Sequence, residues 1–135
     1  MTSAAAFSSQ QITLLCVGLP AAGSTQKAVY ASGDGGAHFR KVGSPPPGGD
    51  GGLLAEPTPR HLFLASASGA TWIYQSTDGG RRWRTNVTFG DGGRGWNDFG
   101  FTTATRGVAV EGNPVIGSRL LMTTNAGRTW HKVKF

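Results

Sequence analysis

The sequence predicts an all-β protein made of three similar antiparallel units, and three observations carry this prediction. An eight-residue pattern, S/T-x-D/N-x-G-x-x-W/F, occurs three times, at residues 32–39, 76–83 and 123–130. The copies are therefore almost evenly spaced, at intervals of 44 and 47 residues. No window has helical periodicity, and the chain of 135 residues contains 22 glycines and 7 prolines, which disfavour helices. A repeat of about 40–50 residues with a turn signal and an aromatic residue is typical of a β-propeller blade.

Each position of the repeated turn has a predicted structural role. The Asp or Asn can accept a backbone N–H bond two residues on, and the Ser or Thr can add a second side-chain bond. The glycine supplies a positive φ, and the aromatic residue can bury an apolar face where the chain re-enters a strand. These positions are Ser32, Asp34, Gly36 and Phe39 in the first copy, Ser76, Asp78, Gly80 and Trp83 in the second, and Thr123, Asn125, Gly127 and Trp130 in the third.

Apolar or alternating stretches around each turn predict four strands per unit. The expected strands are 5–7, 12–17, 28–31 and 39–42 in the first unit, 53–54, 61–65, 72–75 and 83–87 in the second, and 98–102, 107–110, 119–122 and 130–135 in the third. The chain 1–135 is thus a single propeller segment with blades at approximately 1–44, 45–93 and 94–135. The glycine-rich stretches 44–52 and 90–95 fall at the same phase of the repeat, so we interpret them as blade-to-blade connectors.

The repeated turn resembles the Asp-box, also called the bacterial neuraminidase repeat (BNR). Asp-boxes occur in sialidases, xyloglucan-cleaving glycosidases, sortilin-type receptors and photosystem II assembly factors. The resemblance implies that each turn joins the third and fourth strands of a blade, on the rim and away from a ligand site. Two copies depart from the strict pattern, with Phe39 in place of Trp and Asn125 in place of Asp. Because these families have unrelated activities, the resemblance is informative about architecture more than function.

Three blades cannot close a ring, because propellers close with about 4–8 blades. We therefore expect either a homodimer that forms a six-bladed ring or completion by further blades of a longer chain. The family resemblance favours an extracytoplasmic or secreted protein, although residues 1–11 contain no Lys or Arg and so give no signal-peptide pattern. No apolar run is long enough to predict a membrane span.

The net charge of +6 indicates either a solvated basic rim or an acidic partner, such as a protein surface, an anionic glycan or a lipid head group. Nucleic acid is disfavoured, because no aromatic residues interleave with the basic ones. Cys16 is the only cysteine and is expected to be a small buried hydrophobe on its strand. We find no metal-ligand spacing and no nucleotide-binding loop, so no metal or cofactor is expected.

The leading functional hypothesis is a non-enzymatic binding or scaffold module for a protein or glycan. In propellers the ligand face is formed by loops around the central channel. These loops contain Arg94, Trp96, Asn97, Asp98 and Asn113. Trp96 is the best single candidate to stack on a sugar or to contact a partner, and its alternative role is packing between blades.

The alternative hypothesis is part of a sialidase-like or xyloglucanase-like glycoside hydrolase. Such enzymes usually need two carboxylates that face each other. After the carboxylates of the turns and connectors are set aside, Glu56, Asp98 and Glu111 remain. A catalytic pair would then be shared with other blades or with a second subunit.

Overall fold

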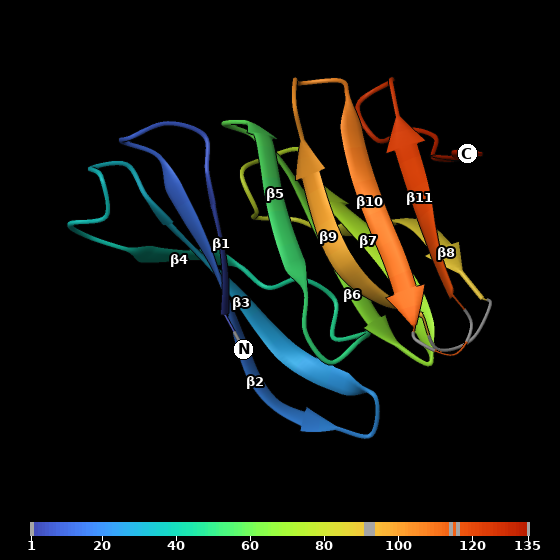
Figure 1. Cartoon of the computed structure of the whole chain (residues 1–135). Helices are drawn as coiled ribbons and strands as arrows, with labels where there is room; N and C mark the ends of the chain where they lie inside the picture. The colour runs from blue at the N-terminus through green and yellow to red at the C-terminus, as the bar shows by residue number, and fades with distance from the viewer. Residues whose placement is uncertain (1, 91–93, 114, 116, 135) are drawn as a thin grey trace.

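The chain folds into three four-stranded antiparallel sheets, as seen in a computed structural model that describes residues 2–90, 94–113, 115 and 117–134 (Figure 1). Within these ranges there is no helix. Blade 1 contains β1 (Thr2–Ala6), β2 (Ile12–Ala21), β3 (Ser24–Ser32) and β4 (Arg40–Gly43); blade 2 contains β5 (Leu53–Thr58), β6 (His61–Ser68), β7 (Ala70–Ser76) and β8 (Arg84–Phe89); blade 3 contains β9 (Gly95–Phe101), β10 (Gly107–Asn113), β11 (Gly117–Thr123) and β12 (His131–Lys132). The predicted all-β class with three four-stranded blades is confirmed.

Two strands of blade 1 are longer than predicted, and the last strand of blade 3 is shorter. β2 and β3 continue to a tight turn at Ala22 and Gly23, whose φ angles are 48° and 79°. β12 pairs with β11 only through Leu121 and Met122, so it covers two residues of the predicted 130–135. Phe135, and residues 91–93 of the second connector, lie outside the described residues.

The core consists of two apolar clusters, one at each junction between blades. Blade 2 contributes to both, because successive residues of a strand point to opposite faces of the sheet. Leu62 and Leu64 of β6 join the cluster with blade 1, while Phe63 and Ala65 join the cluster with blade 3. All four side chains are at most 1% exposed. The middle blade is thus buried on both faces, which explains the continuous apolar run in its second strand.

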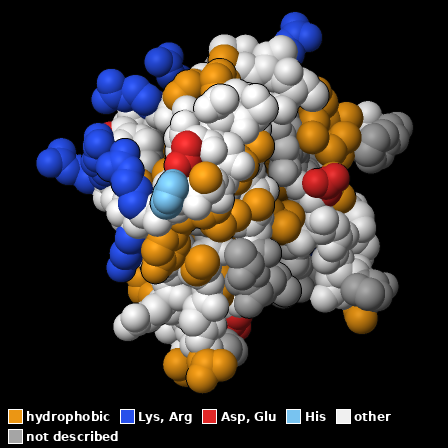
Figure 2. Space-filling model, turned by 90° about the vertical axis from the view of Figure 1, so that its left-hand side faces the viewer, with side chains coloured by type: hydrophobic (Ala, Val, Ile, Leu, Met, Phe, Trp, Pro, Cys, Tyr) orange, Lys and Arg blue, Asp and Glu red, His pale blue; other side chains and the backbone are white. Residues whose placement is uncertain are grey.

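Blade 1 has one face that no other described blade covers. Leu14 pairs with Tyr30 across β2 and β3, in the same register as Leu64 with Tyr74 in blade 2. Leu64 and Tyr74 are buried against blade 1, whereas Leu14 and Tyr30 remain partly exposed. Cys16 lies on this open face and is exposed, so the expectation that it is buried was wrong. Figure 2, seen from the side on which blade 1 lies, shows apolar side chains over the middle of the molecule and Lys and Arg toward one edge.

Blade 3 has a similar open face on the opposite side of the arc. Val108 pairs with Met122 and Val110 with Leu120 across β10 and β11. These residues alternate with Ala109 and Leu121, which are buried against blade 2. Met122 is 37% exposed, and the other three are half-buried. Both ends of the arc therefore carry an apolar sheet face.

The three repeated turns share one hydrogen-bond pattern. The first-position hydroxyl, of Ser32, Ser76 or Thr123, accepts the N–H of the glycine four residues later at 2.9, 2.9 and 3.0 Å. The Asp or Asn Oδ1 also accepts an N–H four residues later, at 3.0, 2.9 and 3.0 Å. The predicted reach of two residues was therefore too short for this side chain. In the first turn, bonds from the Ser32 hydroxyl and then from His38 lower the pKa of Asp34 to about 2.

The aromatic residues of the second and third turns pack toward the preceding blade. Trp83 contacts the cluster between blades 1 and 2, and its Nε1 donates to the Gly80 carbonyl at 2.8 Å. Trp130 packs in the cluster between blades 2 and 3, 5.8 Å from the ring of Phe99. Phe39 is 38% exposed, because the corresponding face of blade 1 is open. The expected burial thus occurs at both tryptophans but not at Phe39.

Candidate binding site between blades 1 and 2

The five loop residues expected to bind a ligand do not form one site. Trp96 is half-buried, and its Nε1 donates to the Ser66 carbonyl at 3.0 Å. Its ring lies 6.2 Å from Phe89 and 6.4 Å from Phe99, so it packs between blades 2 and 3. It also lines a cavity of about 240 Å³ whose other lining residues come from 50–53, 65, 67 and 95. Trp96 thus has the packing role that was the alternative to ligand contact.

The other four residues are not among those lining the Trp96 cavity. Arg94 is half-buried, and Asn97 is exposed. Asp98 is also exposed and accepts the N–H of Phe99 at 2.8 Å. Asn113 Oδ1 accepts the N–H of Val115 at 2.8 Å in the loop after β10.

The three carboxylates outside the turns and connectors lie in three different places. Glu56 is buried at the junction of blades 1 and 2, where it accepts hydrogen bonds from blade 1. Glu111 is fully buried at the junction of blades 2 and 3, where it binds Thr71 and Arg119. Asp98 pairs with Val110 across β9 and β10, on the open face of blade 3. Within the described part of this chain, no two of these three face each other across a cleft.

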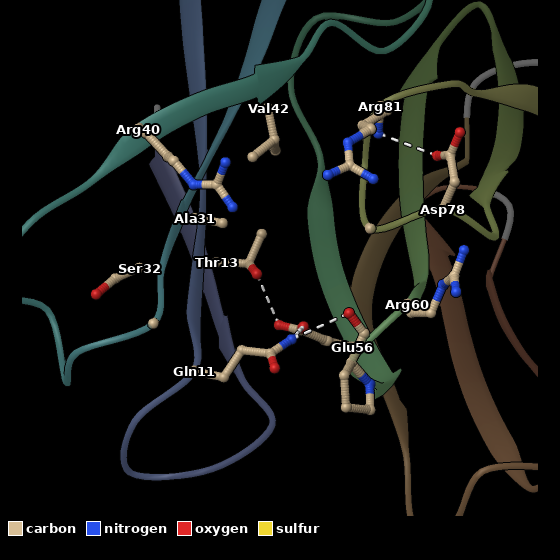
Figure 3. A pocket seen from close by; sticks show the side chains of 13 residues that line it. Gln11, Thr13, Ala31, Ser32, Arg40, Val42, Glu56, Arg60, Asp78 and Arg81 are labelled. Carbon is tan, nitrogen blue, oxygen red and sulfur yellow. Dashed lines mark hydrogen bonds between the residues drawn. The ribbon is translucent and has the colours of Figure 1, made fainter.

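A larger cavity, of about 400 Å³, lies between blades 1 and 2. Its walls include side chains from both blades, and Figure 3 shows how they converge. Arg40 and Thr13 come from blade 1, and Glu56, Arg60 and Arg81 come from blade 2. This volume is in the usual range for a small-ligand or side-chain pocket.

Close backbone approach brings the two blades together beside this cavity. A Cβ on Gly43, at the end of β4, would lie 2.0 Å from the carbonyl oxygen of Gly80 in the second turn. Only a glycine lets β4 and that turn approach so closely. The Gln11 side chain also joins the two blades, since its Nε2 donates to the Pro59 carbonyl at 3.1 Å. Within blade 2, Gly79 N–H donates to the Arg60 carbonyl at 2.9 Å and connects the second turn to the loop before β6. The positions of the cavity residues are therefore fixed by backbone contacts.

The cavity has a basic rim and a buried acidic residue. Arg40, Arg60 and Arg81 are exposed residues around it. Glu56 is 9% exposed, and burial raises its pKa, although hydrogen bonds from Thr13 and Gln11 oppose this. Asp78 also lines the cavity, but its carboxylate is used by the second turn, and the Arg82 N–H bond is the main cause of its lowered pKa.

Sequence reasoning did not find this cavity. Its arginines are about 20 residues apart in the chain, and all lie in or beside turns to which a structural role was assigned. The available signal was that Arg40 directly follows the first turn and Arg81 lies in the second. Because successive blades lie side by side, side chains near successive turns come together in space.

No protein-family model matches the chain, and no curated protein matches its sequence. Solved structures do match it. One of them, a β-propeller, is described as YCF48 bound to D1 peptide. The match has a TM-score of 0.67 at 12% sequence identity and covers 96% of this chain and 39% of that chain. The chain thus spans about two fifths of the length of this structure, and the likeness shows that its fold is that of propeller blades.

Within the described ranges, the structure contains no helix long and apolar enough to cross a membrane. The same ranges contain no group of three or more His, Cys, Asp or Glu side chains arranged to hold a metal ion.

Proposed function

We propose that this chain is a non-enzymatic propeller module that binds an acidic segment of a protein partner in the cavity between blades 1 and 2. The carrying observation is that Arg40, Arg60 and Arg81 all line one cavity. Guanidinium groups bind carboxylates with two parallel hydrogen bonds, so arginines around a concave surface favour an acidic ligand. A protein ligand is favoured over a glycan because the similar structure of YCF48 holds a peptide, and because Trp96, the candidate for sugar stacking, is engaged in packing.

The three repeated turns belong, in this proposal, to the Asp-box type, as their common hydrogen-bond pattern supports. Their Ser, Asp and Gly residues then act in folding. The arginines beside the turns contribute to binding.

Binding can be tested with a set of capped ten-residue peptides that differ in acidic content, measured by fluorescence polarisation. We expect R40Q/R81Q to weaken the binding of acidic peptides by about tenfold or more, because two charge-assisted contacts are lost. The matched control is R106Q, which removes a charge from an exposed arginine in the loop after β9. A loss of equal size in R106Q would mean that net charge alone attracts the peptides, and would contradict a site at this cavity.

We further propose that a second copy completes the ring. The open face of blade 1 carries Leu14 and Tyr30 at the register positions where blade 2 carries Leu64 and Tyr74. The open face of blade 3 carries Val110 and Leu120 where blade 1 presents Leu15 and Val29 to blade 2. Two copies joined head to tail would therefore repeat the existing junction twice and leave no open face.

A further inference from the structure

Glu56 is a buried carboxylate whose hydrogen-bonding capacity is only partly used. Its side chain accepts a bond from Thr13 Oγ1 at 2.7 Å and another from Gln11 Nε2. Both donors are neutral, whereas a carboxylate has about four acceptor positions. No Lys, Arg or His among the described residues forms an ion pair with it. A buried negative charge with only neutral partners is unfavourable, since burial removes its hydration.

A second buried carboxylate, at the junction between blades 2 and 3, has a fuller set of partners. Glu111 there is fully buried and accepts a bond from Thr71 of blade 2 at 2.6 Å. Glu56 of blade 2 likewise accepts a bond from a threonine of the adjacent blade, Thr13, although Glu56 lies on the first strand of its blade and Glu111 on the second. Glu111, however, also has the guanidinium of Arg119 as an ion-pair partner. Within the described part of the chain, Glu56 has hydroxyl and amide donors but no cation as a partner.

The carboxylate that lacks a cation borders the cavity between the blades. Figure 3 shows Glu56 on one side of this space, with Arg40 and Arg81 extending into it from β4 and from the second turn. A lysine or arginine side chain in the cavity could contact Glu56 and would also lie near the two arginines. Such a cation is repelled by the rim unless acidic neighbours on the same ligand compensate.

We propose that Glu56 receives a basic side chain of the ligand, and that the ligand is a protein segment in which a lysine or arginine is flanked by acidic residues. The basic group forms an ion pair with Glu56, as Arg119 does with Glu111. The flanking carboxylates bind Arg40, Arg60 and Arg81. The preference for a ligand with a basic residue rests on the proposed function, because it adds a lysine or arginine contact to the acidic segment already inferred.

The test compares two capped peptides with identical acidic residues, one with a central lysine and one with norleucine in its place. Binding of both is measured on the wild type, on E56Q and on D98N, which changes an exposed carboxylate elsewhere. We expect the wild type and D98N to bind the lysine peptide at least about tenfold more tightly than the norleucine peptide. In E56Q this preference should disappear, because only the lysine peptide loses affinity relative to the wild type.

The outcomes separate this inference from the proposed function. If acidic peptides bind and depend on the arginines, but the wild type does not prefer lysine, the role of Glu56 is wrong and the acidic-segment site stands. The role of Glu56 is also wrong if E56Q lowers the affinity for both peptides equally. If neither peptide binds the wild type, both proposals are wrong. Should E56Q fail to fold, the comparison of the two peptides on the wild type still decides the inference.

Discussion

Ala126 has a left-handed backbone, with φ of 57°, in the third repeated turn. The equivalent residues of the first two turns are Gly35 and Gly79, with φ of 71° and 74°. A side chain in this region clashes with its own backbone, which costs about 1 kcal/mol for a non-glycine residue. The third turn therefore keeps the same path as the others at the expense of some local strain.

We expect A126G to raise the free energy of unfolding by about 0.5–1 kcal/mol, since the relief of strain exceeds the entropy that glycine adds to the unfolded chain. Denaturant unfolding, followed by tryptophan fluorescence, measures this change. The matched control is A37G in the first turn, where φ is not positive, and it should be neutral or destabilising. A destabilised A126G would show that the positive φ carries no strain.

At the scale of residues, local chemistry was predictable and contacts between blades were not. The Ser, Asp and Gly positions of the turns were found because their hydrogen bonds stay within five residues of sequence. The partners of Glu56 lie more than 40 residues away in another blade. No pattern around Glu56 shows that Gln11 and Thr13 face it, or that a cation is absent.

At the scale of elements, strand positions followed from apolar runs, but the burial of each face did not. β2 and β6 both follow apolar runs that predicted strands, and Cys16 of β2 was expected to be buried. β6 is buried on both faces because blades 1 and 3 flank it, whereas β2 has a neighbour on one face only. The burial of Cys16 was therefore predicted wrongly, because the alternation within one strand does not show how many blades flank it.

The connector between blades 1 and 2 is held by one lysine of β3. Lys27 is 4% exposed, and its Nζ donates to the carbonyls of Pro47, Gly48 and Gly49 at 2.9, 3.0 and 2.8 Å. Thr25 N–H also donates to the Pro47 carbonyl at 2.9 Å. The connector thus has a fixed path despite its glycine-rich composition, as expected for a loop between blades and not for a flexible linker.

We expect K27M to lower the free energy of unfolding by roughly 2–3 kcal/mol, because it removes the donor to several carbonyls and leaves them unpaired. Chemical denaturation of the variant measures the loss. K41M, at an exposed lysine of β4, is the control and should stay within about 0.5 kcal/mol of the wild type. If both variants behave alike, the carbonyl contacts of Lys27 contribute nothing to stability.

At the scale of the whole molecule, the arc has two apolar ends that resemble its internal junctions. Leu14 and Tyr30 lie at one end, and Val110 and Leu120 at the other. Continuous apolar faces of this kind are usually interfaces. The repeat spacing predicted this situation, because it gave three blades where a closed ring needs more.

We expect the 14.1 kDa chain to have a mass near twice the monomer value in light scattering, as a two-copy ring requires. L120E places a charge on the open face of blade 3 and should yield monomers. T124E adds the same charge at an exposed residue of the third turn and should leave the dimer intact. A well-folded wild-type monomer would contradict closure by a second copy.

The exposed thiol of Cys16 allows the accessibility of the open face of blade 1 to be measured by alkylation. Alkylation of a cysteine requires that the reagent reach the sulfur. Ser66, which pairs with Trp72 as Cys16 pairs with Ala28, is 1% exposed because blade 1 and the first connector cover it. A neighbour on the face of Cys16 would hide the thiol in the same way. The rate at which this thiol is alkylated therefore reports whether a second copy or another blade covers this face of blade 1.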